Sequence, residues 1–255
     1  MSAEPIVPSF HEKVWGSTGL APWFPTPEAK TGEVWFETGG RLPLIKFLFT
    51  SDRLSVQVHP DDHYAQANGG GNGKTEMWHI LRAGPGAQVA IGFRRRITAE
   101  TLRESAENST VETLLNWITV RPGDTLFVPA GTVHAIGAGL ALCEIQQHSD
   151  VTFRLYDYGR PRELHLDQAI EAAFLGTCPG RAGLPVRCPY FHTERLSLDG
   201  PQRLDPVRNP SALIVLEGAG AINGTPIQPG EVWEIPPGDS AELEGQAVLL
   251  RTFIP

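Results

Sequence analysis

Cysteine is scarce in this chain of 255 residues, which contains only Cys143, Cys178 and Cys188. Their number is odd, and none of them stands in CxxC spacing. This argues against a disulfide scaffold and against a zinc site built from cysteines. We therefore expect a reducing, cytoplasmic setting for the protein.

Long apolar runs and an excess of basic residues are also lacking. No run approaches the roughly 18–20 apolar residues that span a bilayer, and the N-terminal MSAEPIVPSFHEKVW does not read as a secretory signal. The formal net charge of -8 argues against a general nucleic-acid binder. A few arginines and lysines inside a cleft would still suffice to bind an anionic small molecule.

The residues that are abundant favour β-structure. The 22 prolines and 27 glycines are spread along the chain, as expected for many turns between short strands. We therefore predict an all-β fold, although residues 1–40 look irregular. Two stretches have helical spacing: residues 98–118, where Thr98 can cap the first of two short amphipathic helices, and residues 166–175.

An internal repeat indicates two β modules of one type. Residues 123–134, GDTLFVPAGTVH, and residues 230–241, GEVWEIPPGDSA, share the same spacing of Gly, Pro and Gly. The histidine of the first copy, His134, is replaced by Ala241 in the second. We predict an N-terminal metal-binding domain, residues 1–176, with a helical insertion at 98–118, and a degenerate C-terminal domain, residues 177–255.

Polar side chains share a strand face in two segments. In LSVQVH, the alternation of a β-strand places Gln57 and His59 on the same side. In GKTEMW, the same period groups Lys74, Glu76 and Trp78. Polar groups on one face of a strand are the geometry expected of a ligand site.

Together with the histidine of the VPAGTVH turn, these segments offer a metal-binding set. Gln57, His59, Glu76 and His134 supply one amide, two imidazoles and one carboxylate. Nitrogen and oxygen donors without thiolate suit a catalytic divalent ion such as zinc, with a position left for water or substrate. A further polar group follows in the chain: Glu144, Asp150, Arg154 and Arg160.

The motifs resemble those of a known family. GDTLFVPAGTVH is similar to the second motif of the cupin superfamily, and QVH stands in the place of its paired histidines. LSVQVHPDD, GKTEMWHIL, VPAGTVHAIGAG and EIQQHSDVTFRLYDYGR resemble the signatures of type I phosphomannose isomerases in their short bacterial form. The resemblance implies two cupin-type jelly-roll barrels with a few short helices. It also implies one zinc ion per chain and the interconversion of mannose 6-phosphate and fructose 6-phosphate through a cis-enediol.

The resemblance implies roles for single residues as well. It makes zinc ligands of four residues: Gln57, His59, Glu76 and His134. Arg154 matches the active-site arginine of the family, and Lys74 matches its substrate-facing lysine. Larger members carry a lysine six residues after that arginine. Arg160 stands there in this chain, which keeps the positive charge but changes the geometry.

The proton chemistry leaves alternatives open. Lys74 and Arg160 suit the substrate phosphate, whereas Arg154 would stabilise sugar oxygens or hold the phosphate, because arginine is a poor proton carrier. Glu144 is the first choice for the base that moves the proton between the C1 and C2 carbons. Asp150 and His148 are the other candidates, and Asp150 also suits substrate contact or a turn.

Three competing functions can be set against the isomerase. One is a related isomerase of sugars or other sugar phosphates on the same metal site. Another is a non-catalytic sugar-binding cupin that acts as a sensor. The third, an iron cupin oxygenase, would want three histidines, and Gln57 stands where one of them would be. The complete polar set argues against a pure binder, which would not need all of it.

Overall fold

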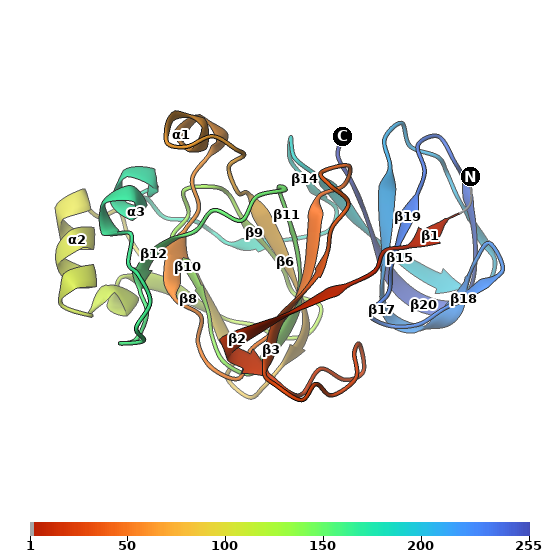
Figure 1. The fold of residues 1–255 in the computed structure, drawn as a ribbon, viewed down its shortest axis with the longest axis horizontal. Coiled ribbons are helices and arrows are strands. Elements are labelled where there is room, and N and C mark those ends of the chain that lie inside the picture. The colour runs from red at the N-terminus through yellow and green to blue at the C-terminus, as the bar shows by residue number, and fades with distance from the viewer. Residues whose placement is uncertain (1–2) are drawn as a thin grey trace.

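The computed structural model describes residues 3–255. Strands make up 44% of the chain and helices 10%, which confirms the all-β prediction. The strands form three sheets, and Figure 1 shows the helices at one end of the molecule and the C-terminal strands at the other. No closed barrel is found in residues 3–255, so the two jelly-roll barrels stay a prediction.

A seven-stranded antiparallel sheet forms the middle of the molecule, in the order β13-β9-β6-β11-β4-β3-β2. Its strands are β2 (Ser9–Ser17), β3 (Thr31–Phe36), β4 (Leu44–Phe49), β6 (Glu76–Ala83), β9 (Thr125–Val128), β11 (Leu140–Gln146) and β13 (Arg181–Ala182). Every residue of the central strand β11 is buried, because other parts of the chain pack on both faces of the sheet. Residues 1–40 look irregular in sequence, but they contribute two strands to this sheet, β2 and β3.

A five-stranded sheet packs on one face of the seven-stranded sheet, in the order β12-β5-β10-β7-β8. Its strands are β5 (Val56–Val58), β7 (Gln88–Phe93), β8 (Leu115–Thr119), β10 (His134–Ile136) and β12 (Phe153–Tyr156). The core between the two sheets includes Ile80, Leu142 and Val89. Burying each such side chain contributes about 1.5–3 kcal/mol.

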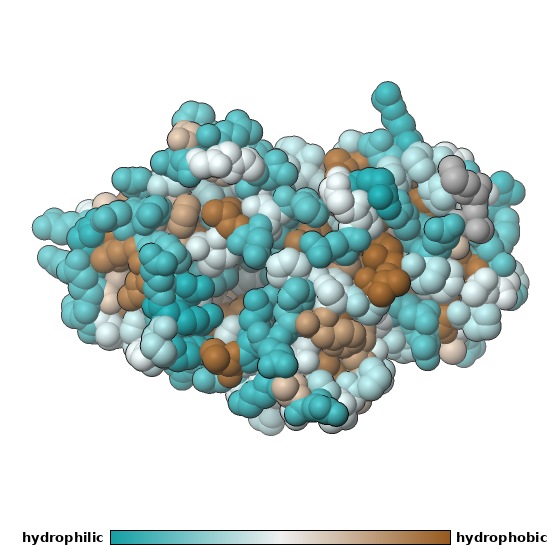
Figure 2. All heavy atoms as spheres, in the orientation of Figure 1, coloured by the Kyte–Doolittle hydropathy of each residue, from teal (hydrophilic) through white to brown (hydrophobic). Residues whose placement is uncertain are grey.

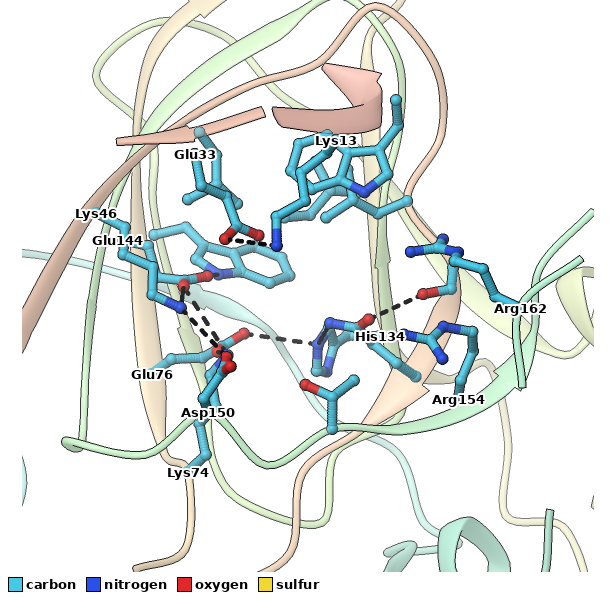
Figure 3. Close-up of a pocket in the computed structure, with 18 residues that line it drawn as sticks. Lys13, Glu33, Lys46, Lys74, Glu76, His134, Glu144, Asp150, Arg154 and Arg162 are labelled. Atoms are coloured by element: carbon cyan, nitrogen blue, oxygen red, sulfur yellow. Dashed lines mark hydrogen bonds and ion pairs between the residues drawn. The ribbon is translucent and has the colours of Figure 1, made fainter. Parts of the chain in front are cut away.

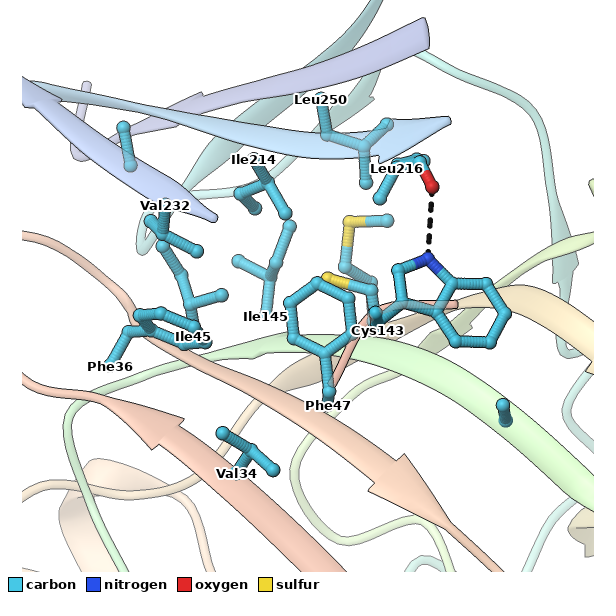
Figure 4. Packing of buried hydrophobic residues seen from close by; sticks show 14 of the residues in the cluster. Val34, Phe36, Ile45, Phe47, Cys143, Ile145, Ile214, Leu216, Val232 and Leu250 are labelled. Atoms are coloured by element: carbon cyan, nitrogen blue, oxygen red, sulfur yellow. Dashed lines mark hydrogen bonds between the residues drawn. The ribbon is translucent and has the colours of Figure 1, made fainter. Parts of the chain in front are cut away.

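The third sheet has eight strands and holds most of the C-terminal chain. Its main path runs β1-β19-β17-β20-β15-β14, with β16 on β20 and β18 on β17. The strands are β1 (Glu4–Pro5), β14 (Val186–Arg187), β15 (His192–Asp199), β16 (Gln202–Leu204), β17 (Ser211–Ile222), β18 (Thr225–Ile227), β19 (Val232–Ile235) and β20 (Ala241–Phe253). Figure 4 shows Ile214 and Leu250 of this sheet packed against Phe47 and Ile145 of the seven-stranded sheet.

Four helical segments are present in residues 3–255: α1 (Asp62–Ala67), α2 (Ala99–Glu107), the 3-10 helix η1 (Val111–Thr113) and α3 (Leu166–Ala172). Thr98 caps α2 as predicted, because its side chain accepts a hydrogen bond from the Thr101 backbone N–H. The second helix predicted within residues 98–118 is wrong. Only η1 forms there, and the next residues build β8, where Ile118 and Trp117 pair with β7.

The repeated turns have matching backbone conformations. Gly123 precedes β9 and Gly230 precedes β19, with φ values of 87° and 92°. Gly131 follows β9 and Gly238 follows β19, with φ values of 82° and 73°. These are left-handed conformations that glycine adopts without strain. The glycine spacing read from the sequence therefore reflects one turn geometry used twice.

Figure 2 shows that hydrophilic residues cover most of the visible face, with apolar residues scattered among them. Within residues 3–255, no helix has the length and apolar character needed to cross a membrane.

Candidate functional site

A cavity of about 270 Å³ lies between the five-stranded and seven-stranded sheets. Figure 3 shows the charged side chains that converge on it. Seven of the nine site residues predicted from the sequence line this cavity: Gln57, Lys74, Glu76, His134, Glu144, Asp150 and Arg154. Of the other two, His59 is buried directly beside Glu76, and Arg160 is turned away from the cavity.

Strand register explains why these residues meet. On the five-stranded sheet, Gln57 pairs with both His134 and Arg154, so the three side chains form a row on one face. On the seven-stranded sheet, Glu144 pairs with Lys46 of β4. The two rows line the same cavity from opposite sheets.

Three ligand atoms converge at one end of this arrangement. His59 Nε2 lies 3.5 Å from Glu76 Oε2, and His134 Nε2 lies 3.6 Å from Glu76 Oε1. One ligand atom from each residue lies within 4.8 Å of the others. Each residue is only 1% exposed. The prediction that these three residues come together in space is therefore correct.

Both histidines are held as neutral rings with the lone pair of the ligand nitrogen turned toward Glu76. His59 Nδ1 donates to the Val151 carbonyl at 2.8 Å, and His134 Nδ1 donates to the Thr132 carbonyl at 2.9 Å. These backbone contacts leave the lone pair on Nε2, as in many metal sites. Burial lowers the pKa of His59 well below its ordinary value and that of His134 to about 4.

The donor set fits a divalent cation. Among the described residues 3–255, His59 Nε2 and Glu76 Oε2 are buried without a hydrogen-bond partner. Buried polar atoms are normally satisfied, and a cation between them would satisfy both. Gln57 lies next to this group, with its Nε2 3.3 Å from His134 Nε2. Turning this amide by 180° would present its oxygen to the cation as a further ligand atom.

Lys74 and Glu76 are a buried pair of opposite charge. Lys74 Nζ lies 3.4 Å from Glu76 Oε2. Burial raises the pKa of Glu76, and the charge of Lys74 opposes that rise. Burial alone would lower the pKa of Lys74, but the carboxylates of Glu76 and Glu144 outweigh it and the pKa is raised. Lys74 therefore stays a cation at the cavity wall.

Glu144 has the environment of a proton acceptor. Its Oε2 accepts a hydrogen bond from Trp78 Nε1 at 3.0 Å, and its Oε1 lies 3.8 Å from Lys46 Nζ and 4.0 Å from Lys74 Nζ. Burial, together with the charge of Glu76, raises the pKa of Glu144 to about 7. A carboxylate with a pKa near neutrality can both take up and release a proton at neutral pH.

The structure adds four charged residues to the cavity that the sequence did not single out: Lys13, Glu33, Lys46 and Arg162. Lys46 is 2% exposed and lies 3.9 Å from the centroid of the Trp35 ring. A signal for Lys46 was present, since it is the only charged residue in the apolar run LPLIKFLF. Lys13 and Glu33 come from the region that looks irregular in sequence.

The predicted substrate contacts divide into two groups. Asp150 is exposed but lines the cavity, 4.0 Å from Lys46 Nζ, and Arg154 lines the cavity as well. Arg160 does not line it. Its Nη2 donates to the Arg53 carbonyl at 2.7 Å, and its guanidinium lies over the Tyr158 ring. The geometry thus gives no support for Arg160 as a substrate contact.

No family model matches the chain, but known proteins do. Mannose-6-phosphate isomerase ManA of Bacillus subtilis is 33% identical, over 97% of this chain and 98% of the relative. A crystal structure of mannose 6-phosphate isomerase from Bacillus subtilis matches all of both chains with a TM-score of 0.91 at 27% identity. A zinc-bound structure of a mannose 6-phosphate isomerase matches all of both chains with a TM-score of 0.78 at 17% identity.

Proposed function

The chain belongs to the mannose-6-phosphate isomerase family, and we propose that it interconverts mannose 6-phosphate and fructose 6-phosphate with the help of one zinc ion. The observation that carries the proposal is the grouping of two neutral imidazoles and Glu76 beside Glu144 and Lys74 in one cavity. The reaction needs a base near carbon and positive charge near oxygen, and this cavity offers both.

Four residues would hold the metal: Gln57, His59, Glu76 and His134. When bound, a divalent ion supplies Lewis-acid stabilisation of the negative charge that develops on the sugar oxygens. Two buried atoms without a hydrogen bond, Nε2 of His59 and Oε2 of Glu76, support this assignment. Nitrogen and oxygen donors without thiolate suit a catalytic divalent ion such as zinc.

Glu144 would remove the proton from C2 of the aldose and return it to C1, while a proton moves from O2 to O1, so that the reaction passes through a cis-enediol. Its hydrogen bond from Trp78 holds the carboxylate in place, and Lys46 and Lys74 keep positive charge beside it. The burial of these groups excludes water, which strengthens each electrostatic interaction. Arg154, at the other side of the cavity, would bind the substrate, as would Asp150.

The fold relationship supports a finer architectural proposal. We propose that the chain contains two cupin-type modules, residues 1–176 with the metal site and residues 177–255 without one. The matched glycine conformations of the two turns support this division. Among residues 3–255, two strand pairings and one isolated bridge cross the boundary: β1 pairs with β19, β13 pairs with β9, and Phe93 bridges to Thr177. A cytoplasmic location stays a prediction from the sequence.

The test is a coupled assay of protein treated with EDTA and then reloaded with zinc, using mannose 6-phosphate as substrate. We expect activity to disappear with the metal and to return with zinc or another divalent ion. Equal activity with and without metal would contradict the metal assignment. Parallel assays with fructose 6-phosphate, glucose 6-phosphate and free mannose test the substrate. Turnover of another sugar alone would identify a related isomerase, and absence of turnover on all four would favour a sugar-binding sensor.

A further inference from the structure

The two sides of the cavity differ in charge balance. On the side of the seven-stranded sheet, Lys46 and Lys74 lie among carboxylates and are neutralised by them. On the other side, Arg154 and Arg162 point into the cavity without a carboxylate between them and the ligand space (Figure 3). Asp157 offsets the charge of Arg162, but Arg154 has no carboxylate partner among the described residues, so this side keeps a net positive charge that suits a phosphate monoester, which is close to a dianion at neutral pH.

Arg162 is fixed in position by a buried carboxylate. Its Nε and Nη2 donate to the two oxygens of Asp157 at 2.6 and 2.7 Å. Asp157 is only 2% exposed. This bidentate contact uses one edge of the guanidinium. The remaining nitrogen, Nη1, takes no part in these two bonds, and Arg162 lines the cavity.

The loop that carries Arg162 is closed by its own backbone. The Arg154 carbonyl accepts from His165 N–H at 2.8 Å, and the Arg154 N–H donates to His165 Nδ1 at 3.2 Å. Within the loop, the Arg162 N–H donates to the Arg160 carbonyl at 2.8 Å. Arg160 also contacts Asp157, since its Nη2 lies 3.0 Å from Asp157 Oδ1 and its Nε donates to the Asp157 carbonyl, but only Arg162 of the two lines the cavity. Arg160 is turned toward Arg53, and Arg162 is turned toward the cavity.

Arg154 and Arg162 lie close enough to influence each other. Burial lowers the pKa of Arg154, and the neighbouring charge of Arg162 lowers it further. Arg154 Nη1 donates to the Glu163 carbonyl at 2.8 Å, while its Nε is buried without a partner among the described residues. Asp157 offsets part of the repulsion between the two guanidinium groups, and an anionic ligand that contacts both would offset the rest.

We propose that Arg162, positioned by Asp157, forms a phosphate clamp together with Arg154 and takes the place that the family resemblance suggests for Arg160. The inference rests on the proposed function and deepens it, because it fixes the direction of the substrate. With its phosphate at the two arginines, a hexose phosphate points C1 and C2 toward Glu144 and Lys74. The cavity of about 270 Å³ is small among ligand sites, which suits a single sugar phosphate.

The first experiment compares Arg162→Ala, Arg162→Lys and Arg160→Ala with the wild-type zinc enzyme. We expect Arg162→Ala to raise KM for mannose 6-phosphate about 10- to 100-fold, the range for losing hydrogen bonds to a charged group. The kcat value should change much less, because Glu144 and the metal ligands are untouched. Arg162→Lys keeps the charge but loses the two-nitrogen contact of the guanidinium, so its KM should lie between those of the wild type and Arg162→Ala. Arg103→Ala is the control, since Arg103 pairs with Asp167 on the surface.

Phosphate itself provides a readout that does not depend on turnover. Inorganic phosphate and mannitol 6-phosphate are titrated calorimetrically into the metal-free protein, with mannitol as the ligand that lacks phosphate. We expect Arg162→Ala to weaken binding of both phosphate ligands and to leave mannitol binding unchanged. The melting temperature of each variant shows whether it is folded, and Arg162→Lys serves as the folded variant if Arg162→Ala is not.

Asp157→Asn tests whether Asp157 positions Arg162, and Arg160→Ala is measured beside it because Arg160 contacts the same carboxylate at 3.0 Å. The substitution should raise KM without a matching fall in kcat, and the double variant with Arg162→Ala should be no worse than Arg162→Ala alone. Such non-additivity is expected when one residue acts through another. Fully additive effects on KM would contradict the positioning role.

The outcomes separate this inference from the proposed function. If the wild type isomerises mannose 6-phosphate but Arg162→Ala retains normal KM and normal phosphate binding, the clamp is wrong and the function stands. If only Arg160→Ala shows the selective loss, the phosphate lies at the position suggested by the family resemblance. If the wild type does not turn the substrate over, the function fails, and the phosphate titrations still decide the clamp.

Discussion

Replacing Glu144 with glutamine tests the proposed base with little change of shape. The glutamine oxygen can still accept the hydrogen bond from Trp78 Nε1, which is 3.0 Å long in the wild type. The exchange removes one negative charge near Lys46 and Lys74 and removes the ability to accept a proton. The metal ligands His59, Glu76 and His134 are not altered, so metal retention should be normal.

The expected loss follows from the role of the carboxylate. A positioned general base contributes about 100- to 10,000-fold to the rate, equivalent to about 3–5 kcal/mol of transition-state stabilisation. We expect kcat of Glu144→Gln to fall within that range, with KM changed far less. The loss of a charge alone should have a smaller effect. Glu33→Gln supplies that comparison, because Glu33 lines the same cavity and pairs with Lys13 at 3.3 Å.

The most direct assay follows proton exchange at carbon. Incubation of mannose 6-phosphate with the zinc enzyme in D₂O should introduce deuterium at C2, and proton NMR measures its rate. Glu144→Gln should lose this exchange together with turnover, whereas Glu33→Gln should retain most of both. Exchange at the wild-type rate in Glu144→Gln would refute the assignment of the base, and Asp150 would then be the next candidate.

The pH dependence carries the same reasoning. Burial and the charge of Glu76 raise the pKa of Glu144 to about 7, and only the ionised carboxylate accepts a proton. The value of kcat/KM should therefore fall as pH decreases through the pKa of Glu144. A bound cation lowers this pKa, so the fall should lie near pH 7 or below it. The acidic limb should be absent from the residual activity of Glu144→Gln. An unchanged limb would assign it to another group.

Two further predictions concern metal retention and acid stability. His134→Ala should lose zinc on dialysis, while Arg154→Ala should retain it and lose most turnover; zinc analysis of both variants distinguishes the roles, and equal zinc content would contradict them. Burial lowers the pKa of His79 to about 4 from an ordinary 6.5, so the unfolded state binds the proton first and stability falls as pH drops from 6.5 toward 4. The free energy of unfolding of the metal-free protein, measured with urea, falls between pH 7 and pH 4. In His79→Gln this fall should be smaller by about 3 kcal/mol. A fall of the same size as in the wild type would show that His79 does not cause it.

Strand periodicity was sufficient to predict most of the candidate site. Lys74, Glu76 and Trp78 share one face in the sequence, and all three line the cavity. A period of two assigns a residue to a face whatever the partner strand is. The alternation of Glu144 within β11 was predictable for the same reason. Family resemblance then supplied what periodicity cannot, namely which of several polar strands belong to one site.

Helical periodicity was less reliable in residues 111–118. Val111, Leu115 and Ile118 have the spacing of an amphipathic helix, but the chain forms only η1 before it extends as β8. Leu115 is buried whether the segment is helical or extended, so apolar spacing over so few residues does not separate the two forms. The available edge of β7 decides the result, because β8 pairs along it.

The charged residues that were missed owe their place in the site to partners on other segments of the chain. Lys46 is buried in a strand whose other residues are apolar, and its partner Glu144 lies on β11, far along the chain. The position of the Arg162 side chain depends on its contact with Asp157 and on the hydrogen bond between the backbones of Arg154 and His165. Neither contact produces a periodic pattern in the sequence. Family position alone indicated Arg160, since spacing counts residues but not the direction of a side chain. The loop geometry instead assigns the phosphate contact to Arg162. Replacing Arg160 and Arg162 by alanine, one at a time, decides between residue spacing and side-chain direction.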